Sequence, residues 1–223
     1  MWWEEQRSML PFRDRAEAGR LLGSALVAYA GRSDVLILAL PRGGIPVAYE
    51  VAKTLAAPLD VFVVRKLGAP GNEELAIGAA APDGICMVQE QIVAELGIPA
   101  ETVRAIASQA EAERRENEAV YRKNLAPAGI AGKVAIVVDD GIATGATMRA
   151  AITALREIGA KEVVAAVPVA PASTCRELRT LADELICLAT PEIFFTVGQW
   201  YVNFEQISDE EVFALLEQAA TLV

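Results

Sequence analysis

Short, largely apolar runs alternate along this chain with longer segments of helical periodicity. A run without regular polar positions is typical of a strand that is buried on both faces of a sheet. We assign five runs to strands, at residues 35–40, 59–64, 134–138, 162–167 and 184–188. Helical patterns are expected before the first strand, at residues 16–30, and between the strands, at residues 45–56, 146–158 and 174–181. Strands that alternate with helices predict an α/β fold in which a parallel sheet is flanked by helices.

Residues 89–125 depart from this alternation, because two helical patterns follow one another there without an intervening strand. Glu111 precedes Arg115, and Glu118 precedes Arg122, by four residues each. Oppositely charged pairs at this spacing favour an exposed helix. We therefore expect a helical insertion in the sheet domain. The single domain expected over residues 1–223 also contains candidate short strands at 75–81 and 85–88.

Composition and charge narrow the class of protein. The chain has 223 residues with 20 Lys and Arg and 30 Asp and Glu, a formal net charge of −10. An acidic surface repels nucleic acid and anionic membranes, so we expect neither as a partner. No apolar run approaches the roughly 18 residues of a membrane helix. The first residues lack the pattern of a signal peptide, so a cytoplasmic location is expected.

The absence of histidine excludes every His-dependent catalytic triad and every His-ligated metal site. The three cysteines, Cys86, Cys175 and Cys187, are widely spaced and form no Cys-x-x-Cys pair. We expect them to be reduced and mostly buried.

The most specific segment is residues 134–147, where a buried strand ends in Asp139 and Asp140 and a loop of Gly and Thr opens a helix. Ligands of parallel sheets bind outside the carboxyl ends of the strands. Free N–H groups at the helix start, with the hydroxyls of Thr144 and Thr147, suit a phosphate. Carboxylates suit hydroxyl groups or a hydrated Mg²⁺. The pattern favours a sugar phosphate, with an acidic strand end before a capped helix as the alternative.

This segment resembles the phosphoribosyl diphosphate (PRPP) loop of type I phosphoribosyltransferases. The resemblance implies that Asp139 and Asp140 are catalytic residues that hold the 2′- and 3′-hydroxyls of the ribose. It also implies a Mg²⁺ cofactor linked to both carboxylates, indirectly through ribose hydroxyls or water. The residues that would bind the 5′-phosphate are Ala143, Thr144, Gly145, Ala146 and Thr147.

A second loop, Leu40-Pro41-Arg42-Gly43-Gly44, follows an earlier strand, where the family has its pyrophosphate loop. Two glycines let the backbone approach a diphosphate closely, and the Arg42 guanidinium offers a fork of donors. By resemblance, Arg42 is catalytic and binds pyrophosphate together with Gly43 and Gly44. Arg65 and Lys66 follow the next strand, and we assign Lys66 to the pyrophosphate site. A solvated strand end is the alternative for this pair.

Aromatic residues concentrate near the C-terminus. Five of the 13 aromatic residues fall within 11 positions, at Phe194, Phe195, Trp200, Tyr201 and Phe204. Members of the family carry a small C-terminal hood over the active site, and the resemblance places it at about residues 190–223. Phe195 and Val197 are then the residues expected against a nucleobase. Packing of these aromatic side chains into the core is an equal alternative.

Three departures from the family pattern concern the acceptor. Ala143 replaces an Asp of the 6-oxopurine enzymes, and no base-reading Lys occurs in Ala170-Pro171-Ala172. The helical insertion at 89–125 takes the place of a mobile catalytic hairpin. This insertion either brings a side chain to the pyrophosphate or forms a helix at a dimer interface. We favour the dimer interface. The candidate side chains are Arg114, Arg115, Tyr121, Arg122 and Lys123.

The wording Pro-Arg-Gly-Gly and Asp-Asp-Gly-Ile-Ala-Thr-Gly-Ala-Thr is shared with a bacterial group of predicted, uncharacterised phosphoribosyltransferases. The resemblance implies transfer of phosphoribose from PRPP to a nitrogenous acceptor, with release of pyrophosphate. The acceptor is not expected to be a 6-oxopurine, and a homodimer is expected. The alternatives are a PRPP or nucleotide sensor without turnover and another ribose-phosphate enzyme. We expect Asp140 to lie outside the core, so that Asp140→Asn lowers PRPP affinity with little loss of stability.

Overall fold

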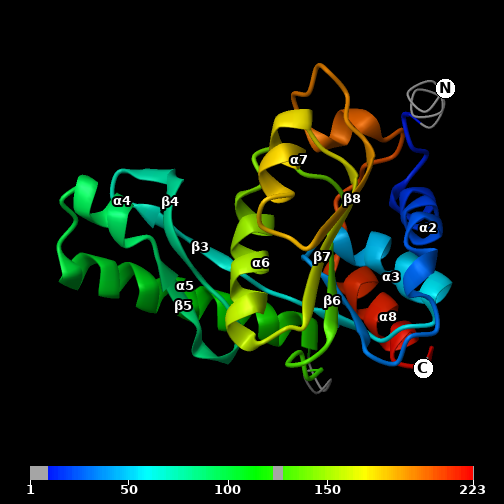
Figure 1. Cartoon of the computed structure of the whole chain (residues 1–223), viewed down its shortest axis with the longest axis horizontal. Coiled ribbons are helices and arrows are strands. Elements are labelled where there is room, and N and C mark those ends of the chain that lie inside the picture. Colours follow the sequence, from blue (N-terminus) through cyan, green and yellow to red (C-terminus); the bar gives the residue numbers. More distant parts are fainter. Residues whose placement is uncertain (1–9, 123–127, 223) are drawn as a thin grey trace.

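The computed structural model describes residues 10–122 and 128–222 and has a central sheet of five parallel strands (Figure 1). The order across the sheet is β2-β1-β6-β7-β8. The strands are β1 (Val35–Ala39), β2 (Leu59–Val61), β6 (Val134–Val138), β7 (Glu162–Val169) and β8 (Glu184–Ala189). The predicted α/β fold with a parallel sheet is therefore confirmed.

Helices cover both faces of the sheet because its central strands are apolar at successive positions. In β1, Val35 and Ile37 belong to a buried cluster on one face, and Leu36 and Leu38 to a cluster on the other. The helices of the first face are α2 (Arg15–Ala25), α3 (Gly44–Leu55) and α8 (Asp209–Ala219), with the short turn η1 (Val27–Tyr29). Those of the second are α6 (Ala146–Ile158) and α7 (Ala172–Leu178). Both faces are thus shielded from water.

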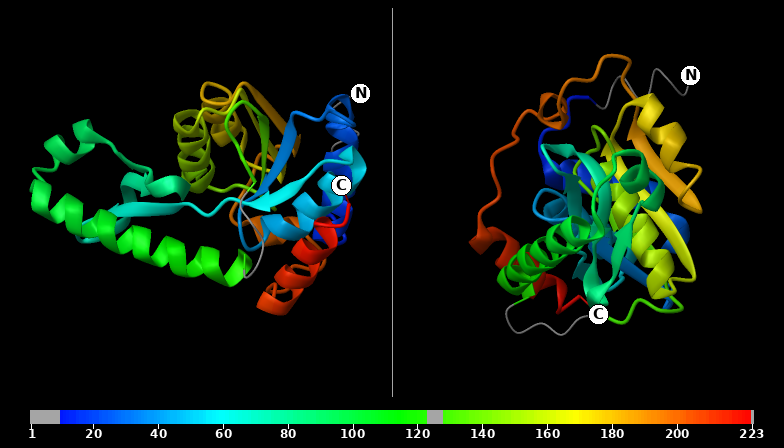
Figure 2. Two further views of the ribbon diagram at one scale, coloured as in Figure 1. Left: turned by 90° about the horizontal axis from the view of Figure 1, so that it is seen from below. Right: turned by 90° about the vertical axis from the view of Figure 1, so that its left-hand side faces the viewer.

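Residues 65–122 form an arm that projects from the sheet domain (Figure 2). Its antiparallel sheet has the order β3-β4-β5. The elements of the arm are β3 (Arg65–Ala69), β4 (Asn72–Ala80), η2 (Pro82–Gly84), β5 (Cys86–Val88), α4 (Glu90–Glu95) and α5 (Ala100–Arg122). Helix α5 packs along β3 and β4 through a small core that includes Leu67, Ile77 and Ala110. The helices expected at 89–125 and the short strands expected at 75–81 and 85–88 are present as α4, α5, β4 and β5. The helices do not replace a hairpin, because β3 and β4 form one ahead of them.

The ion pairs of α5 agree in part with the expected spacing. Arg115 donates to Glu111 at 2.6 Å, as the sequence suggests. Glu118 instead accepts a hydrogen bond from Arg114 at 2.6 Å, and Arg114 also pairs with Glu111. The Arg114 side chain is buried. The side chain of Arg122 and the whole of Lys123 lie outside the described residues. Among the described residues, no helix is both long and apolar enough to cross a membrane.

The chain after β8 divides into two parts. Residues 190–205, the hood segment, contain the turn η3 (Val197–Trp200) and are tied to the N-terminal segment, where Phe12 donates to the Trp200 carbonyl at 2.8 Å. Helix α8 then returns to the sheet domain and packs on α3, with Ser208 capping its first turn. The expected hood at 190–223 is therefore limited to its first half. Of the three free thiols, Cys175 is buried, Cys187 partly so, and Cys86 exposed.

Candidate active site

Two strand exits meet at the carboxyl edge of the sheet. Strands β1 and β6 are neighbours, with Ala39 opposite Val138 in register. The loop at residues 40–43 follows β1 and the acidic pair follows β6, so parallel pairing places them side by side. The Leu40 amide donates to the Val138 carbonyl at 2.9 Å. The structure therefore brings together Arg42, Gly43 and Gly44 with Asp139 and Asp140, as the sequence predicts.

The two glycines are required by this close approach. A Cβ atom on Gly43 would lie 2.0 Å from Asp140 Oδ2, and one on Gly44 would lie 2.6 Å from the Val138 carbonyl oxygen. Neither position has room for a side chain, because the acidic pair occupies that space. The glycines thus serve contact between the two loops as well as the approach of a ligand.

Asp140 is held in a buried ion pair. Arg15 Nε, from the first turn of α2, donates to Asp140 Oδ2 at 2.8 Å, and both residues are below 10% exposed. The Asp140 carbonyl accepts from the Tyr201 hydroxyl of the hood segment. The expectation that Asp140 lies outside the core is wrong, because α2 and the hood segment cover it. Replacing it would leave the Arg15 charge buried without its partner, which costs stability.

The Asp139 carboxylate has fewer hydrogen-bond partners among side chains than that of Asp140 in the described part of the chain. Its Oδ1 accepts from the Asp140 amide at 2.8 Å, and no side chain donates to it in the described part of the chain. Burial raises the pKa of Asp139 well above its ordinary range, and the neighbouring charge of Asp140 raises it further. Burial also raises the pKa of Asp140, although the Arg15 hydrogen bond opposes that shift. Asp139 is therefore the carboxylate that a ligand hydroxyl can satisfy.

The loop at residues 143–147 leads into the open N-terminus of α6. Gly145 adopts a left-handed conformation with φ of 77° just before the helix, and no side chain caps it. The carbonyls of the loop are satisfied, since Thr174 Oγ1 donates to Ala143 at 2.9 Å and Arg149 Nη1 to Thr144 at 2.8 Å. Because no side chain caps α6, its first N–H groups can bind an anion, as expected for a phosphate site.

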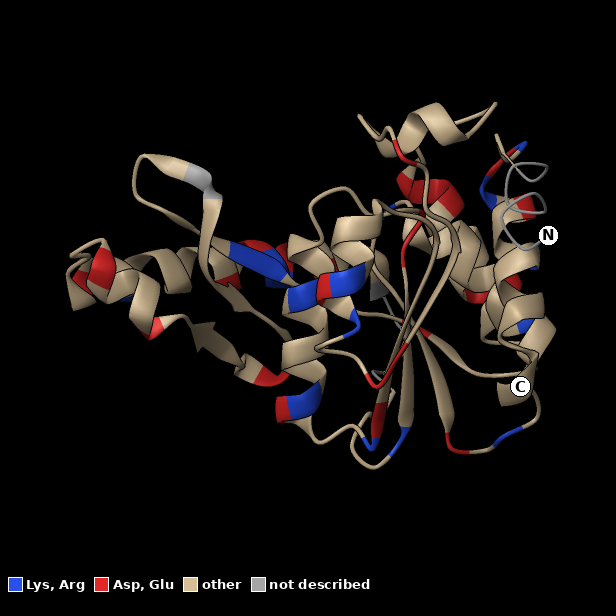
Figure 3. Ribbon diagram, turned by 45° about the horizontal axis from the view of Figure 1, so that its top comes forward, with Lys and Arg blue, Asp and Glu red and all other residues tan. Residues whose placement is uncertain are grey.

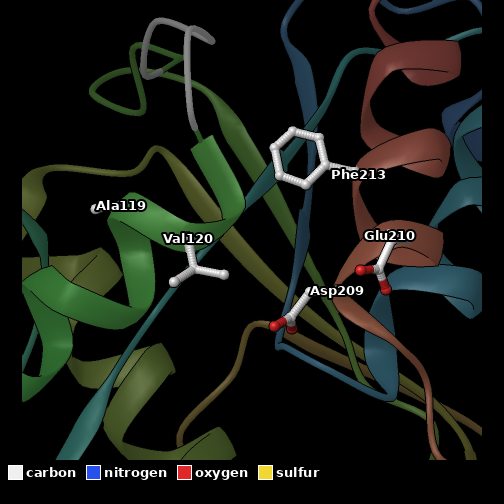
Figure 4. A pocket seen from close by; sticks show the side chains of 5 residues that line it. All are labelled: Ala119, Val120, Asp209, Glu210 and Phe213. Atoms are coloured by element: carbon white, nitrogen blue, oxygen red, sulfur yellow. The ribbon is translucent and has the colours of Figure 1, made fainter.

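Arg42 reaches across the site to two helices. Its Nε donates to the Tyr121 hydroxyl of α5 at 3.3 Å, and its Nη2 lies 3.4 Å from Asp209 Oδ1 at the start of α8. Asp209 also lines a pocket of about 410 Å³ between α5 and α8 (Figure 4). Of the candidate side chains in the insertion, Tyr121 thus reaches Arg42 of the loop after β1. Arg114 and Arg115 pair within α5 instead.

Lys66 is placed near the phosphate loop. It lines a groove of about 760 Å³ between the arm and α6, together with Thr144, Ala146 and Thr147. Arg65, its neighbour, pairs with Glu113 of α5 at 2.7 Å and supports the arm. The assignment of Lys66 to pyrophosphate remains a prediction.

The hood residues differ in their surroundings. A Cβ atom on Gly141 would lie 2.5 Å from Val197 Cγ1, so Val197 packs directly over the acidic loop. Phe195 is 80% exposed and contacts solvent. Most of the aromatic cluster packs internally, with Tyr201 stacked on Phe204 at a centroid distance of 5.1 Å. The core-packing alternative therefore accounts for Tyr201 and Phe204 but not for Phe195, and Val197 is the hood side chain that lies over the acidic loop.

The donor set fits a Mg²⁺ ion held indirectly. No group of three or more metal-ligating side chains occurs among residues 10–122 and 128–222. Asp140 Oδ2 is bonded to Arg15, whereas no side chain donates to Asp139 in the described part of the chain, so the Asp139 carboxylate is the more open of the two to water or a ribose hydroxyl. Acidic and basic residues are mixed over the sheet domain and the arm (Figure 3). Charge at the site is therefore set locally, by Arg15, Arg42 and the acidic pair.

Sequence reasoning missed two residues of this site. Arg15 stands 125 positions before Asp140, and Asp209 stands far beyond Arg42. Neither belongs to a motif, and only the packing of α2 and α8 against the sheet brings them to the strand exits. The position of Arg15 in the first turn of α2 is the one local feature, and it does not show that the side chain pairs with Asp140.

Comparison with known proteins shows the family to which this fold belongs. Residues 15–204 match the family model described as the phosphoribosyl transferase domain. The chain is 46% identical over 208 residues to "Putative phosphoribosyl transferase MT0597" and "Putative phosphoribosyl transferase Rv0571c", from two strains of Mycobacterium tuberculosis. The match covers 93% of this chain and 47% of each relative, so the chain spans about half the length of these relatives.

A solved structure extends the agreement to the whole fold. The crystal structure of TT1426 from Thermus thermophilus is similar to this chain with a TM-score of 0.84 and 38% identity. The similarity covers 93% of this chain and 98% of that one. The fold, the two loops and the match over most of the sequence agree: the chain belongs to the phosphoribosyl transferase domain family.

Proposed function

We propose that this protein transfers the phosphoribosyl group of PRPP to a nitrogenous acceptor, with Mg²⁺ as cofactor and pyrophosphate as the second product. The observation that carries the proposal is the contact between the Gly43–Gly44 loop and the acidic pair, beside the open start of α6. This arrangement offers donors for two phosphate groups and an acceptor for ribose hydroxyls within one site.

The chemical demand of the reaction is negative charge on the departing pyrophosphate. The Arg42 guanidinium and the amides of its loop would stabilise that charge. When bound with PRPP, Mg²⁺ would supply further positive charge to the same oxygens. Asp139 would orient the ribose, so that its C1 atom faces the acceptor while positive charge develops on the ring.

The acceptor side is less polar than the donor side. Ala143 is exposed at the loop where the 6-oxopurine enzymes carry an acid, and Ala170 follows β7 where they carry a lysine. Val197 covers Gly141 from the hood segment. These neutral side chains support an acceptor that is not read as a 6-oxopurine.

Calorimetric titration with PRPP, with and without Mg²⁺, tests the donor site. We expect Mg²⁺-dependent binding, and pyrophosphate release that requires an added nucleobase or amine. In thermal unfolding, PRPP at 100 times its Kd should add about 2.7 kcal/mol of stability. A protein that binds no PRPP would contradict the proposal. Binding without release for any acceptor would favour a sensor.

Arg42→Ala is expected to weaken PRPP binding about tenfold or more and to change the affinity for ribose 5-phosphate less than threefold. Arg42 belongs to the loop proposed to bind pyrophosphate, and a charged hydrogen bond contributes roughly 1.5–3 kcal/mol. Titration of both ligands into both proteins measures the difference. Arg115→Ala is the control: this arginine lies on helix α5 of the arm, its side chain is 69% exposed, and its substitution should alter neither affinity. Equal losses for the two ligands would remove Arg42 from the pyrophosphate site.

A further inference from the structure

Arg15 contacts three parts of the site at once. Its Nε donates to Asp140 Oδ2 and its Nη1 donates to the Glu205 carbonyl, each at 2.8 Å. Its guanidinium carbon lies 3.8 Å from the centroid of the Phe204 ring. The planar fork of arginine makes such contacts in two directions while its face stacks on a ring. One buried side chain of α2 therefore joins the acidic pair to the hood segment.

A second connection runs in parallel. The Tyr201 hydroxyl donates to the Asp140 carbonyl, and the Tyr201 ring stacks on Phe204. Asp140 is thus held by its carboxylate from α2 and by its backbone from the hood segment. On its remaining side it touches Gly43 of the pyrophosphate loop. Displacement of the hood segment would be transmitted to Asp140, and through it to both loops.

We propose that Arg15 is a positioning residue, which fixes Asp140 and hood residues 197–205 in one arrangement over the ribose side of the site. The inference rests on the proposed function for its effect on PRPP, whereas its structural part is independent of any ligand. Arg15 touches no reacting atom and acts through Asp140 and the Glu205 carbonyl. Arg15 therefore couples the position of the hood segment to the position of the Asp140 carboxylate.

Two substitutions separate the functions of the Arg15 fork. Arg15→Met removes the charge and both donors; Arg15→Lys keeps a charge for Asp140 but has no second arm for the Glu205 carbonyl. We expect Arg15→Met to bind PRPP at least tenfold more weakly and hydrogen exchange at residues 197–205 to become at least tenfold faster. We expect Arg15→Lys to restore PRPP affinity to within about threefold, while exchange of the hood segment stays fast.

Arg156→Met is the matched control. Arg156 also pairs with an aspartate, Asp183, and donates to a backbone carbonyl, that of Leu181, but at an exposed position away from the site. It should change neither readout. Exchange in α3 serves as the internal reference, because general loss of stability would raise it together with that of the hood segment.

Each outcome decides the inference. Hood exchange that is the same in wild type and Arg15→Met, or that rises equally in α3, would overturn it. If Arg15→Met does not fold, Arg15→Lys and Phe204→Leu carry the test, since both loosen the contact between Arg15 and the hood segment; unchanged hood exchange in both would then overturn the inference. If wild type binds no PRPP, the proposed function fails, and the exchange experiment still decides the role of Arg15.

Discussion

Asp139→Asn is expected to weaken PRPP binding by about 10- to 100-fold while the protein stays folded. The Asp139 carboxylate is the one at the β6 exit that no side chain occupies among the described residues, so a ribose hydroxyl can bond to it. An amide replaces one acceptor oxygen with a donor and removes the charge, at a cost of roughly 1.5–3 kcal/mol. Calorimetric titration with PRPP and Mg²⁺ measures the loss. An unchanged Kd would remove Asp139 from the ribose site.

The same substitution should raise stability without ligand. Because the pKa of Asp139 is raised by burial, the folded state binds its proton more tightly than the unfolded state. The stability that this proton contributes is fully present below the ordinary pKa of 3.8 and is lost as the pH rises through the raised value. At pH 7, Asp139→Asn therefore relieves a cost, and its unfolding free energy should depend less on pH above 4.

Asp183→Asn provides the opposite case. The Val163 amide and Arg156 lower the pKa of Asp183, so its stabilising effect is present above the ordinary pKa and is lost as the pH falls. The substitution should slightly destabilise the protein at pH 7, with the effect reduced by the exposure of the pair. Thermal unfolding of both variants between pH 4 and 8 compares them. Destabilisation by Asp139→Asn at pH 7 would show that the carboxylate is satisfied in the folded protein.

The sheet and the two loops were predictable because they depend on local pattern. Strands such as β1 and β6 are apolar at every position, and the loops that follow them carry glycine and charge at short spacing. Parallel pairing then brings their exits together, so that the loop containing Arg42 lies beside the acidic pair. The residue types at neighbouring positions were therefore sufficient to predict this part of the site.

Strand β3 of the arm and the ion pair of Asp140 were not predictable in this way, whereas β4, β5 and the two helices of the arm were expected. Small residues such as Gly68 in β3 and Gly78 in β4 hide the alternation of the hairpin that these two strands form. Position 78 requires glycine, because a Cβ atom there would lie 2.2 Å from the Met87 carbonyl oxygen of β5. Arg15 reaches Asp140 only through the packing of α2, which no spacing rule encodes. Long-range contacts therefore decide which of two adjacent carboxylates is structural.

Gly43→Ala is expected to lower the free energy of unfolding by about 3 kcal/mol and to abolish measurable PRPP binding. The backbone at Gly43 has φ of −61° and ψ of −31°, which alanine adopts freely, so strain in the main chain plays no part. The cost comes from the new Cβ atom, which would lie 2.0 Å from Asp140 Oδ2. Asp140 cannot yield without breaking its bond to Arg15, and breaking a buried pair costs roughly 3–5 kcal/mol.

Urea and thermal unfolding measure this loss, which for a chain of this size corresponds to roughly 6–12 °C in Tm. Gly129→Ala is the matched control, because nothing lies within 4 Å of its Cβ position. It should be neutral or slightly stabilising, since alanine reduces the entropy of the unfolded chain. If Gly43→Ala were as stable as Gly129→Ala, the Asp140 carboxylate would be free to move. The two loops would then be neighbours without being coupled, and the ribose and pyrophosphate sites would respond independently to substitution.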